Sequence, residues 1–203
     1  MKVLQSGEIL RGVNIPGLPP LDLDSPNVTS AVRSEEFAPD QFRLLSNHVR
    51  PLVIDRMTIA WNEISATSKL VADFVAKFVQ VIVLQNENTS TRHSSGSNGQ
   101  YIGQVVITNP HSEYAGDIEI AEAIVHEAIH SLLFMALHTV PWGTDHNHTY
   151  ATGVKIVSPW TGTPLDVEQF LQACFVWYGL LHFWDLALRV KTFKGSDKAR
   201  SLG

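Results

Sequence analysis

Two histidines and a glutamate in the middle of the chain have the spacing of a metal centre. The run His126-Glu127-Ala128-Ile129-His130 would place its histidines about 40° apart on one face of an α-helix, one turn from each other. Both imidazoles could then reach one metal ion at roughly 2.0–2.1 Å. Glu127 projects about 100° further round the helix, close enough to hydrogen-bond a metal-bound water. We therefore predict that His126 and His130 ligate a metal and that Glu127 is catalytic.

The residues on both sides of this motif are strongly apolar, as in 123–125 and 132–134. Burying two imidazoles and a carboxylate in such a helix costs several kcal/mol unless they are hydrogen-bonded or bound to a metal. The alternative interpretation is a pair of core histidines that are satisfied by the backbone or by Glu127. The apolar context favours the metal centre.

A metal held by two imidazoles needs a further ligand, and the candidates lie downstream. Glu168 and Gln172 are one turn apart on an expected helix. Glu168 would complete a set of two histidines and a carboxylate, which suits zinc in a peptidase or iron(II) in an oxygenase. Gln172 would ligate through its neutral amide oxygen. His138 lies two turns beyond His130 and is too far along the helix, and the polar cluster 145–148 lacks the spacing of the extended motif.

Other residues are candidates for binding a cosubstrate or substrate. Lys155 and Arg92 could each pair with a carboxylate, although both could equally be exposed surface charges. Trp160 lies in an expected turn and could form a pocket wall. Trp177 and Cys174 are expected to belong to an apolar helix, with Cys174 as an inert core thiol.

The pattern of apolar residues predicts an α+β fold: a mainly helical single domain with a small β-sheet. The motif helix is expected to be buried and to pack on a long C-terminal helix. We expect an extended N-terminal arm over 1–36, the metal-binding domain over 37–191 and a charged C-terminal tail over 192–203. The expected helices are 39–46, one beginning at Pro51, 68–78, 117–137 and 164–191; the expected strands are 80–84, 101–108 and 150–157, with a long polar loop over 85–100.

Composition limits the class of protein. The chain has 203 residues, of which 44% are hydrophobic and 17% charged, and a net charge of −5. This favours one globular domain over a disordered chain and gives no reason to expect a nucleic-acid partner. The apolar run 131–137 is shorter than the roughly 20 residues of a membrane span. The single cysteine excludes an internal disulfide. We expect a soluble cytoplasmic protein without a membrane partner.

Three segments together resemble the αKG-HExxH-type peptide β-hydroxylases of ribosomal-peptide modification systems. They are Ile124–Phe134, then Ser158-Pro159-Trp160, then Phe170–Trp184, preceded by a serine-rich loop with Ser94–Ser97 and a strand; the resemblance covers about 50–185. It implies iron(II), 2-oxoglutarate and O₂ as cofactor and cosubstrates, with His126 and His130 as metal ligands.

The chain departs from that family in two respects. Gln172 stands where the family is expected to carry a third ligand histidine, so the resemblance places it in the metal site. Thr161 and Thr163 replace arginines that could bind a carboxylate. The predicted cofactor-binding residues are Lys155, Trp160 and Thr163.

We therefore expect an enzyme, a mononuclear non-haem iron(II) oxygenase that acts on an amino-acid or peptide side chain. The first alternative is a zinc metallopeptidase with Glu127 as general base. The second alternative is a non-catalytic relative that binds a peptide. The sequence does not indicate the oligomeric state.

Overall fold

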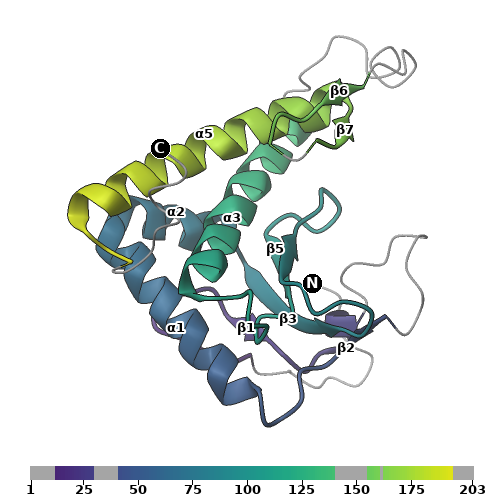
Figure 1. Ribbon diagram of the computed structural model, residues 1–203, viewed down its shortest axis with the longest axis vertical. Helices are drawn as coiled ribbons and strands as arrows, with labels where there is room; N and C mark the ends of the chain where they lie inside the picture. Colours follow the sequence, from purple (N-terminus) through teal and green to yellow (C-terminus); the bar gives the residue numbers. More distant parts are fainter. Residues whose placement is uncertain (1–11, 30–40, 140–154, 161, 194–203) are drawn as a thin grey trace.

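The computed structural model describes residues 12–29, 41–139, 155–160 and 162–193 (Figure 1). The elements in chain order are β1 (Leu21–Asp22), η1 (Pro26–Thr29), β2 (Phe42–Arg43), α1 (Arg50–Thr67), α2 (Lys69–Phe78), β3 (Val81–Glu87), β4 (Ser94–Gly96), β5 (Gln104–Thr108), α3 (Asp117–Thr139), β6 (Ile156–Val157), β7 (Pro164–Leu165) and α5 (Val167–Val190). About half of the described residues are helical and the strands form a small mixed sheet. The predicted α+β class, mainly helical with a small sheet, is confirmed.

The sheet has a parallel pair at its centre. Strands β3 and β5 run parallel, β1 adds a parallel neighbour to β3, and β4 closes the other side antiparallel to β5. Because side chains alternate along a strand, Ile82, Leu84 and Ile107 face the helical core, while Val83 and Val106 pack with Val28 on the other face. The motif helix α3 follows β5 in the chain and is connected to the sheet by a single loop.

Helix α3 lies at the centre of the domain, next to the sheet and in contact with α1, α2 and α5 (Figure 1). Its side chains at Ile120, Ile124 and Ala128 are completely buried. By length and composition α3 could also span a membrane, and half of its most apolar window is buried inside the molecule. A buried core helix meets the same criterion, and α3 packs as one.

Helix α5 crosses α3 at close range. A Cβ atom on Gly179 would come within 2.7 Å of Ile129 Cδ1, so the missing side chain lets the two helices approach one residue away from His130. The start of α5 is fixed by a capping box. The Asp166 side chain accepts from the backbone N–H of Gln169, and the Gln169 side chain accepts from the backbone N–H of Asp166. These two features set the position of α5 against the motif helix.

Several sequence expectations are corrected by the structure. The helix expected over 39–46 is wrong for its described part, where Phe42 and Arg43 pair antiparallel with β3; pairing with a sheet edge outweighs a weak local helical pattern. The expected strand at 101–108 begins at Gln104, because residue Gly103 has a φ of 88° and ends a turn. The polar loop expected over 85–100 contains the end of β3 and all of β4.

The described part of the expected N-terminal arm belongs to the core. Leu21 in β1 is fully buried and pairs with Ile82, and Leu18 and Leu23 are also buried. At the other end, Phe193 is buried and packs edge-on against Trp184. Most of the expected strand 150–157 lies outside the described residues, with β6 as its described end.

Candidate metal and substrate site

His126 and His130 lie side by side on one face of α3. Their ring centroids are 4.9 Å apart, as the four-residue spacing predicts. Burial lowers the pKa of His126, the nearby Glu127 raises it and His130 lowers it further. The net effect favours the neutral imidazole, which is the form that ligates a metal.

Glu127 is held by two serines beside His126. Its side chain is only 3% exposed. Ser95 Oγ donates to Glu127 Oε1 at 2.7 Å, and Ser97 Oγ donates to Oε2 at 2.6 Å. Oε1 lies 4.0 Å from His126 Nε2. Strand β4 and the residue that follows it therefore fix this carboxylate, because each of its oxygens already accepts a hydroxyl hydrogen bond.

Gln172 and Glu168 reach the site from the first turns of α5. Gln172 Oε1 lies 3.0 Å from His130 Nδ1, and Gln172 Nε2 donates to Glu168 Oε1 at 3.4 Å. Because an amide oxygen only accepts, the bond requires the proton of His130 on Nδ1, which leaves the lone pair of Nε2 for a metal. The structure thus brings Gln172 into contact with His130, a predicted metal ligand, and Glu168 into contact with Gln172.

The protein atoms of this site suit a divalent first-row metal by donor type. His126 and His130 present two imidazoles side by side on α3, and imidazole is a good ligand for iron and zinc. Among the described residues, no group of three His, Cys, Asp or Glu side chains is placed to hold a metal. Residues Asp145, His146 and His148 lie outside the described part of the chain.

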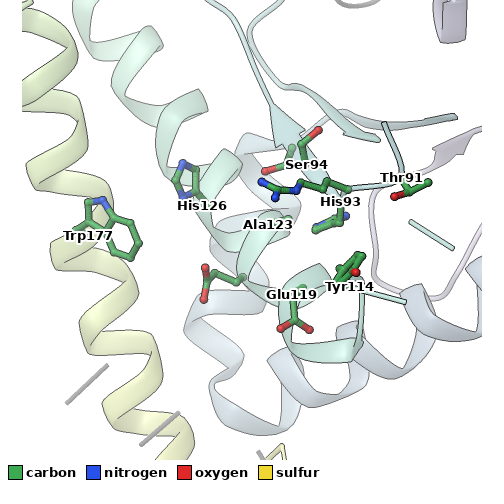
Figure 2. A pocket seen from close by; sticks show the side chains of 11 residues that line it. Thr91, His93, Ser94, Tyr114, Glu119, Ala123, His126 and Trp177 are labelled. Carbon is green, nitrogen blue, oxygen red and sulfur yellow. The ribbon is translucent and has the colours of Figure 1, made fainter. Parts of the chain in front are cut away.

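A cavity of about 660 Å³ opens on the His126 side of α3. Its walls come from residues 91–95, from Tyr114, from Trp177 on α5 and from the α3 residues Glu119, Glu122, Ala123 and His126. In Figure 2, Glu119 and His126 lie on α3 between Trp177 on one side and Tyr114 and His93 on the other. The volume lies within the range of small-molecule sites, roughly 300–1,000 Å³. His126 is thus the motif residue that faces a ligand-sized space.

The three predicted cofactor-binding residues are placed differently. Trp160 is partly exposed and stacks on Trp177 at a centroid distance of 5.8 Å, so it supports a cavity wall from behind. Lys155 is exposed at the start of the β6–β7 hairpin, and Thr163 accepts at its carbonyl from the backbone N–H of Ser158. Neither Lys155 nor Thr163 lines the cavity, whereas Arg92 does.

Sequence reasoning missed most of the cavity. Glu119, Ala123 and His126 have the spacing of one helix face. The sequence therefore could have predicted that Glu119 and Ala123 lie on the same face as His126. The hydrogen bonds from Ser95 and Ser97 to Glu127 were harder to predict. The serine-rich run is visible in the sequence, but its contact with α3 depends on the register of β4. No model of a known protein family matches the chain, and no curated protein matches it.

Proposed function

We propose that this protein is a mononuclear non-haem iron(II) oxygenase that oxidises an amino-acid or peptide side chain with 2-oxoglutarate and O₂ as cosubstrates. The supporting observation is that His126 and His130 are paired on a buried helix, with His126 at the wall of a ligand-sized cavity. We place the activity in the cytoplasm, in keeping with a cysteine that has no disulfide partner.

In this proposal His126 and His130 hold the metal and Gln172 completes the site. Bound iron(II) supplies the activation of O₂, which is coupled to the oxidation of 2-oxoglutarate. Gln172 either ligates through Oε1 or orients His130 through the 3.0 Å hydrogen bond to Nδ1. The Glu168 carboxylate accepts from Gln172 Nε2 and so fixes the direction in which Oε1 points.

The hydrogen bonds of Glu127 are compatible with a supporting role in an oxygenase. A peptidase needs this carboxylate as general base, directed at a water on the metal. Here both of its oxygens accept from Ser95 and Ser97. A buried carboxylate held in this way supports the loop and the helix beneath the site, which is a role that an oxygenase can use without a general base.

Arg92 is the better candidate for binding the carboxylate of 2-oxoglutarate. It lines the cavity together with His126, and a guanidinium can form two parallel hydrogen bonds to a carboxylate. Trp177, backed by Trp160, gives this space an apolar wall. Lys155 and Thr163 remain predicted contacts, on a hairpin whose residues do not line the cavity.

The test is purification without oxygen, metal analysis, and measurement of succinate formed from 2-oxoglutarate with and without O₂. We expect iron(II)-dependent and O₂-dependent succinate formation that is lost in His126→Ala. Arg92→Leu should raise the KM for 2-oxoglutarate about tenfold or more, since it removes a charge-assisted pair. Peptide cleavage that continues without O₂, with zinc as the only metal, would replace this proposal with the peptidase. If neither reaction occurs, the oxygenase proposal is wrong.

A further inference from the structure

The cavity beside His126 carries two carboxylates at one end. Glu119 and Glu122 both line it from α3. The backbone N–H of Gly116 donates to Glu119 Oε2 at 3.1 Å, and the indole N–H of Trp184 donates to Glu122 Oε2 at 3.2 Å. These hydrogen bonds hold the two carboxylates in place, so their negative charges have fixed positions in the cavity wall.

Aromatic faces accompany this charge. Tyr114 and Trp177 line the same cavity, and Trp160 stacks on Trp177 with an interplanar angle of 17°. Aromatic rings attract cations over their faces, most strongly when the cation leaves water. The part of the wall formed by Glu119, Glu122 and these rings therefore has the chemistry of a site for an organic cation.

The charged residues that line the cavity lie on different elements. Arg92 belongs to the loop before β4, whereas Glu119 and Glu122 belong to the first turns of α3. Ala123 separates Glu119 from His126 on the helix and is small, so its position leaves the cavity open. Seven residues of helix rise by about 10 Å, which matches an extended peptide of about three residues.

We propose that the cavity binds the primary ammonium group of an amino acid or peptide against Glu119 and Glu122, with the attached chain passing over Ala123 to His126. This inference names the substrate class and rests on the proposed function for the idea that a reaction occurs at His126. Binding itself needs neither iron nor O₂, so it is measured separately from activity.

The first experiment compares peptides that differ in one charge, with binding followed by saturation-transfer NMR and titration calorimetry on the full chain. Acetyl-Gly-Lys-Gly-amide carries a side-chain ammonium, its norleucine counterpart is neutral and its glutamate counterpart is an anion. Gly-Gly-Gly-amide carries only a terminal ammonium, and its acetylated form carries none. We expect at least one of the two cationic probes to bind about tenfold more tightly than its neutral match, and which one does so identifies the source of the amine.

The second experiment tests the assigned wall. Glu119→Gln and Glu122→Gln should each reduce this preference for the cation about tenfold, whereas Asp73→Asn, an exposed carboxylate on α2, should leave it unchanged. Folding of each variant is checked by circular dichroism.

Two results would overturn the inference. One is equal binding of the cationic probes and their neutral matches by the unaltered chain, a comparison that requires no variant to fold. The other is a cation preference that survives both glutamine substitutions. Cation-selective binding without O₂-dependent conversion would leave this inference standing and remove the oxygenase, so the two failures are distinguishable.

Discussion

Gln172 on α5 and His130 on α3 are joined across the helix interface, with Gln172 Oε1 3.0 Å from His130 Nδ1. The contact connects a residue at the start of the C-terminal helix to the second histidine of the motif. Since metal-bound histidines usually donate their other N–H to an oxygen, the contact has the form expected for a residue that orients a ligand.

Gln172→Leu should weaken binding of Co(II) or Zn(II) about 10- to 100-fold, as loss of such a partner does in other metal sites. Gln172→Glu keeps an acceptor and should retain most of the affinity, and Glu168→Gln should change it little. Calorimetry gives the affinities, and the visible absorption of Co(II) separates the two roles. A spectrum that is unchanged in Gln172→Glu assigns orientation of His130, whereas an altered ligand-field spectrum or a gain in affinity in Gln172→His assigns direct ligation.

His126→Ala and His130→Ala should each reduce metal affinity more than about 100-fold, because each removes one of two neighbouring imidazoles and ends two-point attachment. His138→Ala is the matched control. It lies on the same helix but beyond the pair, with Nε2 3.3 Å from the Gly99 carbonyl. If the double variant without His126 and His130 still binds one equivalent of metal, the metal site is not on α3 and the prediction is wrong.

The elements that carry a strong period were predictable from the sequence. The buried helix around His126 and the long helix with Gln172 follow from runs of apolar residues at helical spacing. The pairing of the two histidines follows from helix geometry alone. What these patterns predict is local, so they give the positions of the motif residues along a helix.

The residues that complete the site depend on non-local contacts. Ser95 and Ser97 reach Glu127 only because β4 pairs with β5 in one register, Ser95 opposite Ile107. Glu122 lines the cavity with its carboxylate held by Trp184, which is 62 residues away in the sequence. A single sequence contains no signal for such register or crossing geometry, so the two serine partners of Glu127 could not be predicted.

Ser95→Ala and Ser97→Ala should each lower the free energy of unfolding by about 1.5–3 kcal/mol, because each leaves one oxygen of a buried carboxylate without its hydroxyl donor. Urea denaturation of the metal-free protein measures the change. Ser94→Ala, a neighbouring exposed serine in the same strand, is the control and should change stability by less than about 0.5 kcal/mol. Loss of stability equal to that control would show that the two hydroxyls do not hold Glu127. Glu127→Gln should also destabilise the protein, since it weakens both charge-assisted bonds.

The last prediction concerns pH and His111, which lies between two carbonyls bound by one arginine. Arg56 Nη1 donates to the carbonyl of Pro110 at 3.0 Å and to that of Ser112 at 2.8 Å. Burial lowers the pKa of His111, and the positive charges of Arg56 and His48 lower it further. The unfolded chain therefore binds this proton more readily than the folded chain does.

The sign of the effect follows from this difference. As pH falls below about 6.5, the ordinary histidine value, the unfolded state gains a proton first, so the free energy of unfolding decreases until pH passes the lowered pKa of the folded state. His126, whose pKa is also lowered, adds a second contribution of the same sign. His111→Gln should make the loss of stability smaller in this window, measured by urea denaturation between pH 8 and 5, whereas His182→Gln, an exposed histidine on α5, should not. If His111→Gln and the unaltered chain lose stability equally as the pH falls, the position of His111 beside Arg56 does not contribute to acid sensitivity.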